Sequence, residues 1–341
     1  MNNNNLKYRQ LGKSSLKVSE IGFGAWTLGT DWWGTIKRDE SIRLLQRALE
    51  LGMNFVDTSD SYASGESEKL VGEAIKGQRD KIILSTKFGY DIHSPVKREG
   101  HQEREQIFTP EHINIAVEES LERLQTSYID LYQLHNPKME HVTDATVFGA
   151  LDDLVQNGKI RYYGVALGPA IGWTDEGLNA MKSTNIVSLQ TVYNMVEQDP
   201  GKSFLNVAKE NGVGILVRVP HASGLLDGKF NAQTTFASND HRSYRQREWL
   251  MKGLKKIQPL DFLLKTPLRT IAQTALKFAL TDIGISSVLP TISTMNDLEE
   301  YAKASDLDDL TEEELGTINQ VYTREFQAET LSYLMPKSRT K

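Results

Sequence analysis

Short runs of β-forming residues alternate with amphipathic helical patterns along most of the chain, and this alternation constrains the fold more than any other feature. The expected strands are residues 18–24, 54–58, 81–87, 128–135, 160–166, 186–192, 214–219 and 287–290. Several are almost wholly apolar, as strands buried in a parallel sheet are. Repeated strand–helix units leave an open doubly wound sheet or a closed barrel, and about eight units in roughly 250–300 residues favour the (β/α)8 TIM barrel, an α/β fold.

Helix signals separate these runs. Residues 41–51 have an apolar face of helical spacing, and Thr109 followed by Pro110 indicates an N-cap and a first helical residue. From Thr266 onward, apolar residues keep helical spacing for three turns. We expect each apolar face to pack against the barrel.

No linker rich in Pro, Gly or Ser divides the chain, so we expect one domain over residues 1–341. Its core is expected at about 6–322, followed by a polar tail at 323–341. Long loops at 91–108 and 221–265 follow the third and seventh expected strands, and long loops in a compact domain are often functional lids. The oligomeric state is not predicted.

The composition excludes several classes of function. A net charge of -6 argues against a nucleic-acid partner, which requires a clustered excess of Lys and Arg. The chain has no cysteine, so disulfides, thiolate catalysis and cysteine metal sites are excluded. The polar N-terminus is no signal peptide and no apolar run spans a bilayer, so we predict a cytoplasmic protein without a membrane partner.

Two motif classes are absent from the sequence. The glycines at 22, 24 and 29 do not match the dinucleotide-binding fingerprint G-x-G-x-x-G. The histidines at 112, 141 and 241 have no partner at the spacing of metal ligands, so no metal site is expected.

Polar side chains stand at the ends of three successive expected strands. Asp57, Lys87 and His135 occupy these ends, and Tyr62 follows one short loop after the first of them. Each residue alone has a plain structural explanation, such as a turn cap or a rim aromatic. Because TIM-barrel active sites lie at the carboxyl ends of the strands, the convergence of four polar residues there favours a catalytic site.

A tyrosine beside a lysine suits proton donation to a carbonyl oxygen. A phenol, with an ordinary pKa of about 10, keeps its proton at neutral pH, and a nearby ammonium stabilises the phenolate. Lys87 would supply this charge, and Asp57 would keep Lys87 charged and oriented. His135 would hydrogen-bond the oxygen that Tyr62 protonates. No side chain supplies a hydride, so the hydride must come from a nicotinamide cofactor.

The segments around these four residues resemble the aldo-keto reductase family. The resemblance lies in residues 54–74, 85–87 and 128–135, and it extends in order over roughly 6–322. Residues 6–19 resemble the β-hairpin that caps the barrel bottom in bacterial members. The resemblance implies a TIM barrel without a Rossmann domain, NADPH extended across the barrel mouth, and reversible reduction of an aldehyde or ketone, a small-molecule carbonyl substrate.

The resemblance also implies a set of cofactor contacts. Gln190 matches the family glutamine that binds the nicotinamide amide, and Glu300 matches the acid that reads the adenine amine. The whole implied set is Gly24, Ala25, Trp26, Asp57, Gln190, Arg218, Val219, Pro220, His221, Ser223, Leu225, Lys229, Ser293, Asp297 and Glu300.

Some cofactor positions depart from the family pattern. Ala166 and Leu167 replace the usual Ser-Asn, and Arg218 replaces the aromatic that normally stacks on the nicotinamide. Asp297 stands where many members carry Arg or Gln, and an anion there should repel the 2′-phosphate of NADPH. The family resemblance favours NADP(H) as the cofactor, and these departures leave NAD(H) open.

The expected substrate pocket is aromatic. Trp26, Trp32, Trp33, Tyr62 and His135 would form its walls, which suits apolar or sugar-like carbonyl compounds. The altered cofactor positions also leave a second hypothesis, a nicotinamide-binding sensor or regulatory barrel with little turnover.

Overall fold

Eight parallel strands form the centre of the molecule, each beside the next in chain order. They are β3 (Phe23–Gly24), β4 (Phe55–Asp57), β5 (Ile83–Phe88), β6 (Ile129–His135), β7 (Ile160–Ala166), β8 (Ser188–Val192), β9 (Gly214–Arg218) and β10 (Ile285–Leu289). Parallel bridges from Ile21 to Val288 and from Gly24 to Thr291 join the first strand to the last. The predicted barrel is therefore confirmed. The structure, a computed structural model, describes residues 6–94, 104–168, 173–238, 240–245, 247–265 and 269–327.

The prediction of a single first strand over 18–24 is wrong. β2 (Lys17–Ser19) pairs antiparallel with β1 (Tyr8–Gln10), and only Phe23–Gly24 joins the barrel beside β4. The chain changes partner between them, where the Ser19 hydroxyl donates to the Ile21 carbonyl over 2.8 Å. The pattern of apolar and polar residues over 18–24 does not reveal such a change of partner.

The predicted hairpin cap is confirmed. β1 and β2 close the end of the barrel at which the strands begin. Apolar side chains of the hairpin and its turn join a buried cluster with residues of the barrel strands, made by Leu11, Leu16, Val18, Phe55, Leu131, Val187, Leu216 and Leu289. Gly12 in the hairpin turn has a φ of +52°, and a Cβ there would lie 2.5 Å from the Gly212 carbonyl oxygen. Only glycine allows the turn to lie this close to the barrel.

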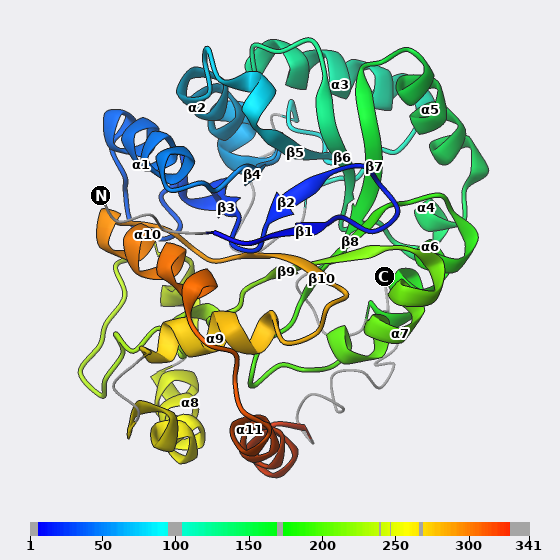
Figure 1. Ribbon diagram of the computed structural model, residues 1–341. Coiled ribbons are helices and arrows are strands. Elements are labelled where there is room, and N and C mark those ends of the chain that lie inside the picture. Colours follow the sequence, from blue (N-terminus) through cyan, green and yellow to red (C-terminus); the bar gives the residue numbers. More distant parts are fainter. Residues whose placement is uncertain are drawn as a thin grey trace.

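Helices surround the barrel and cover its strands (Figure 1). An outer helix follows each of the eight strands, in chain order α1 (Arg38–Glu50), α2 (Glu66–Ala74), α3 (Pro110–Arg123), α5 (Ala145–Gln156), α6 (Thr174–Ser183), α7 (Gly201–Asn211), α9 (Ile271–Ala279) and α10 (Met295–Ala302). Their inner faces form one large buried core with the outward faces of the strands. As predicted, Thr109 caps α3 and Pro110 is its first residue. α9 begins later than the sequence pattern suggests, and residues 266–268 lie outside the described residues.

The remaining elements lie in connections. α4 (Met139–Val142) is a short turn, and the long excursion after β9 contains η4 (Ala222–Gly224), η5 (His241–Tyr244), α8 (Arg247–Ile257) and η6 (Gln258–Lys265). α11 (Glu312–Glu325) continues past the expected tail boundary at 322, and residues 328–341 lie outside the described part. No helix within the described residues is long and apolar enough to cross a membrane. The single-domain boundary of 1–341 stays a prediction.

Candidate active site

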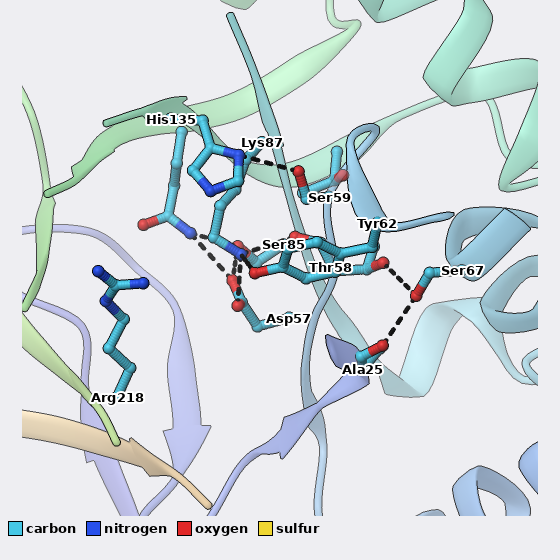
Figure 2. Close-up of polar contacts among 12 residues, drawn as sticks. Ala25, Asp57, Thr58, Ser59, Tyr62, Ser67, Ser85, Lys87, His135 and Arg218 are labelled. Atoms are coloured by element: carbon cyan, nitrogen blue, oxygen red, sulfur yellow. Dashed lines mark hydrogen bonds and ion pairs between the residues drawn. The ribbon is translucent and has the colours of Figure 1, made fainter. Parts of the chain in front are cut away.

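A buried ion pair stands at the carboxyl ends of β4 and β5. The Lys87 ammonium donates to Asp57 Oδ2 over 2.6 Å and to the Thr58 carbonyl over 2.7 Å (Figure 2). Lys87 is wholly buried, and Asp57 is 4% exposed. Burial alone would lower the pKa of Lys87, but Asp57 and Tyr62 outweigh it, and the pKa is raised above its ordinary value. Lys87 is therefore a charged ammonium at neutral pH.

Two neighbouring side chains fix the second carboxylate oxygen. Asp57 Oδ1 accepts hydrogen bonds from the Ser85 hydroxyl at 2.9 Å and from Gln133 Nε2 at 3.0 Å. Neither Ser85 nor Gln133 was predicted from the sequence to be a site residue. Because side chains on one face of a strand recur at every second residue, Ser85 shares the inner face of β5 with Lys87, and Gln133 that of β6 with His135. This two-residue alternation is the sequence signal that could have indicated both residues.

Tyr62 lies against the ion pair. It begins η2 (Tyr62–Gly65), and its hydroxyl is 3.3 Å from Lys87 Nζ. The next two residues, Ala63 and Ser64, have φ values of 49° and 52°, in the left-handed region that non-glycine residues rarely adopt. The tight turn sets the phenol over the barrel mouth with only 8% of the side chain exposed.

His135 completes the predicted group of four. Its Nδ1 lies 3.1 Å from the Ser59 hydroxyl and 3.3 Å from the Ser61 hydroxyl, so Nε2 is the nitrogen left for a substrate. Burial, followed by the charges of Lys87 and Arg218, holds the pKa of His135 well below its ordinary value. The imidazole is therefore uncharged at neutral pH, the state in which one ring nitrogen donates and the other accepts a hydrogen bond. Sequence reasoning missed Ser59 and Ser61.

The aromatic residues expected in the pocket divide into two groups. Trp26 packs edge-on against Tyr62 and Trp32, with ring centroids 5.0 and 4.8 Å away. Trp33 instead lies against the long excursion, where the guanidinium of Arg242 is 4.3 Å from its ring centroid. Trp26 thus borders Tyr62 and Trp32 packs on Trp26, whereas Trp33 contacts the long excursion from the loop after β3.

A further aromatic, Tyr90, borders His135 from the loop after β5. The two ring centroids are 5.1 Å apart, and Tyr90 Oη accepts a hydrogen bond of 2.7 Å from Asn136. Residues 90 and 106 form an antiparallel bridge. The described part of the 91–108 loop therefore lies beside the pocket, and residues 95–103 are outside the described chain.

Two side chains expected at the nicotinamide end, one on β8 and one on β9, have buried donors without partners among the described residues. Gln190 is buried and its Nε2 has no hydrogen-bond partner among the described residues. Arg218 donates from Nη2 to the Leu167 carbonyl at 2.9 Å, while its buried Nε has no such partner. Buried donors normally have acceptors, so both nitrogens fit a polar ligand. Gly24 and Ala25 lie on the other side of the mouth, where the Ala25 carbonyl accepts from Ser67 at 2.9 Å.

The segment after β9 has an unusual backbone. Val219, Ala222 and Ser223 have φ values of 56°, 48° and 58°. Such strain in a β-branched residue persists only where the surroundings enforce it, and it is commonest at ligand sites. Of the other residues expected here, Pro220 and Leu225 are buried.

His221 is a buried packing residue in the structure. Its ring lies 4.7 Å from that of Tyr301, and its Nε2 is 3.2 Å from the Ala272 carbonyl. Burial lowers the pKa of His221 to about 4. The expected contact of this residue with a cofactor stays a prediction.

At the expected adenosine end, Asp297 occupies the N-terminus of α10. Its Oδ2 accepts from the backbone N–H groups of Ser293 (3.2 Å) and Thr294 (3.0 Å), and its Oδ1 pairs with the Lys229 ammonium. Although burial raises it, the pKa of Asp297 lies below its ordinary value because of Lys229 and these hydrogen bonds. Glu300 accepts a hydrogen bond of 2.6 Å from Thr270.

The arrangement can support proton donation to an oxygen held between Tyr62 and His135. The described residues contain no group of His, Asp or Glu able to hold a metal ion. The open donors of Gln190 and Arg218 fit the polar end of a nicotinamide placed beside Tyr62.

Known proteins share this sequence and fold. The sequence model of the aldo/keto reductase family matches residues 20–323. The uncharacterized oxidoreductase YqkF of Bacillus subtilis (strain 168) is 33% identical over 327 residues, 94% of this chain and 97% of that protein. The holo form of aldo-keto reductase AKR11C1 from Bacillus halodurans superposes with a TM-score of 0.73 and 32% identity, over 93% of this chain and 96% of that one. A probable voltage-gated potassium channel subunit beta of Arabidopsis thaliana is 29% identical over 315 residues, 89% of this chain and 92% of that protein.

Proposed function

The chain belongs to the aldo/keto reductase family, and on that premise we propose that it reduces an aldehyde or ketone to an alcohol, reversibly, with NAD(P)H. The observation that carries the proposal is the 3.3 Å approach of Tyr62 Oη to Lys87 Nζ, with Lys87 held by Asp57. A phenol beside a buried ammonium is a proton donor whose phenolate is stabilised as the proton leaves. We place the enzyme in the cytoplasm, acting on a small-molecule carbonyl compound.

Each of the four side chains has a separate role in the protonation of the carbonyl oxygen. The cofactor, when bound, supplies a hydride to the carbonyl carbon. Uncharged His135 donates a hydrogen bond to the oxygen as negative charge develops there, and Tyr62 gives this oxygen its proton. Lys87 stabilises the resulting phenolate, and Asp57 keeps Lys87 in place.

Two residues would hold the nicotinamide end of the cofactor, and a third influences the cofactor preference at the adenosine end. Gln190 and Arg218 have the open donors for the nicotinamide amide. At the adenosine end, the contacts of Asp297 support NADH as the better cofactor, against the preference for NADPH that the family resemblance implies. The backbone donors at the start of α10 already bind a carboxylate, so a 2′-phosphate would meet an anion instead of open N–H groups.

A second candidate function is a nicotinamide-responsive regulatory barrel. The likeness to a potassium channel subunit beta and the changed positions Ala166, Leu167, Arg218 and Asp297 favour it. The interlocked group around Tyr62 favours the enzyme, because a sensor needs no proton donor.

One experiment separates the two functions. The protein is titrated with NADH and NADPH, and nicotinamide absorbance is then followed with a panel of aliphatic, aromatic and sugar aldehydes and ketones. The enzyme oxidises the cofactor with at least one carbonyl class and binds NADH at least as tightly as NADPH. Tight binding without oxidation on the whole panel would support the regulatory barrel, and no binding of either cofactor would refute both functions.

A further inference from the structure

Arg218 places a positive charge at the barrel mouth that no carboxylate of the described residues pairs with. In Figure 2 its guanidinium lies to the left of the Asp57–Lys87 pair, with Tyr62 on the right of that pair. Within the described chain it forms no ion pair with a carboxylate, and its one hydrogen-bond acceptor is the uncharged Leu167 carbonyl. Burial lowers the pKa of Arg218, partly offset by Tyr62, Tyr90 and Asp57, but a guanidinium stays charged at any physiological pH.

The charges that face the mouth do not cancel. Lys87 and Arg218 are cations, whereas Asp57 is an anion already bound to Lys87 at 2.6 Å. His135 is uncharged, since burial and both cations hold its pKa well below its ordinary value. The mouth thus has an excess of one positive charge in a largely buried setting, where electrostatic interactions are stronger than in water.

Two buried donors without acceptors among the described residues lie on the strands beside this charge. Gln190 Nε2 and Arg218 Nε are buried on adjacent strands and lack acceptors in the described structure. The amide oxygen of a nicotinamide is an acceptor that suits both nitrogens. The side chains of Ala166 and Leu167 are apolar and offer the amide no hydrogen bond, whereas those of Gln190 and Arg218 do.

Resting on the proposed reductase function, we propose that Arg218 makes the site discriminate between the redox states of its cofactor. The reduced nicotinamide ring is uncharged, and the oxidised ring carries one positive charge. The charge of Arg218 repels the oxidised ring, and its N–H group donates a hydrogen bond to the amide of either form. The reduced cofactor is therefore held tightly, and the oxidised cofactor leaves readily after each reduction.

The test compares dissociation constants of both redox forms by tryptophan fluorescence quenching, for NADH with NAD+ and NADPH with NADP+. The wild type should bind the reduced form about tenfold or more tighter than the oxidised form. Arg218→Met keeps a side chain of similar length without charge, and the ratio should fall toward one because the oxidised form binds better. Arg218→Lys keeps the charge and should retain most of the ratio. A far-ultraviolet spectrum and a melting curve verify that each variant is folded.

A wild-type ratio below about threefold would overturn the inference, and this measurement needs no variant. A ratio unchanged in folded Arg218→Met, or in Arg218→Gln if the Met variant does not fold, would overturn it as well. Cofactor binding with turnover but without redox preference leaves the reductase function intact. Binding of neither redox form would remove the proposed function and this inference together.

Discussion

The two halves of the barrel mouth differ in how their polar groups are satisfied. On β4 to β6, Asp57, Lys87, Ser85 and Gln133 bind one another, so the donors around Tyr62 have acceptors without any ligand, and the atom of this group without a partner in the described structure is an acceptor, Gln133 Oε1. On β8 and β9, by contrast, buried donors of Gln190 and Arg218 lack acceptors in the described structure. The hydrogen bonds of the first half hold its side chains in place, as the positioning of a proton donor requires. The open donors of the second half are arranged for a ligand that binds and dissociates.

Removal of the proton donor should give the largest effect and tests the first half directly. Tyr62→Phe should lower kcat by about 10²- to 10⁴-fold, as loss of general acid catalysis does. Cofactor dissociation constants should change little, because the ring and its contact with Trp26 remain. Steady-state kinetics and cofactor titration measure the two effects, with Tyr90→Phe as the control for loss of a neighbouring phenol. Equal losses in both variants would contradict the assignment of Tyr62.

Breaking the ion pair should destabilise the fold as well as abolish turnover. Lys87→Met leaves the Asp57 carboxylate buried without its cation, which costs about 3–5 kcal/mol of unfolding free energy. The double variant Asp57→Asn/Lys87→Met should be less destabilised than the sum of the single variants, because no uncompensated charge remains. Denaturant unfolding of all four proteins measures this coupling. Additive losses would show that the first half is less interlocked than its geometry implies.

Acid should lower the unfolding free energy of the protein through His221, which follows β9 in the second half. Its pKa of about 4 in the folded protein lies below the ordinary value of 6.5, so the unfolded chain binds the proton more readily. Stability therefore falls as the pH drops from about 6.5 toward 4, by up to about 3 kcal/mol from this residue. The pH slope of the unfolding free energy should be shallower in His221→Gln than in the wild type. Parallel slopes would show that another group carries the acid sensitivity.

Reversal of charge at the adenosine end should give the smallest of these effects. Asp297→Arg should improve binding of NADPH relative to NADH by about tenfold, or about 1.4 kcal/mol, since a cation replaces an anion beside the 2′ position. Asp297→Asn should give a smaller shift in the same direction. Competitive titration with the two reduced cofactors measures it. A shift toward NADH in either variant would contradict the place assigned to Asp297.

The sequence predicted the barrel and the four residues at its mouth because strand ends carry strong local signals. Asp57, Lys87 and His135 each end a recognisable strand, and closure of the barrel brings such ends together. The division of residues 18–24 between the hairpin and the barrel was not predictable, since pairing partners are set by tertiary structure. Nor could the sequence show that Asp297 binds its own helix N-terminus, that Trp33 packs on Arg242, or that Arg218 lacks a carboxylate partner in the described structure. Each depends on contacts between residues far apart in the chain.

Transfer of a hydride to a carbonyl carbon is the central claim, and an isotope label tests it most directly. Reduced nicotinamide deuterated at the transferring carbon is incubated with the wild-type protein and its best carbonyl substrate, and the alcohol is analysed by mass spectrometry. The account predicts an alcohol with deuterium on the former carbonyl carbon, formed far more slowly by Tyr62→Phe. An alcohol without deuterium, or the same rate of labelled alcohol from both proteins, would contradict it.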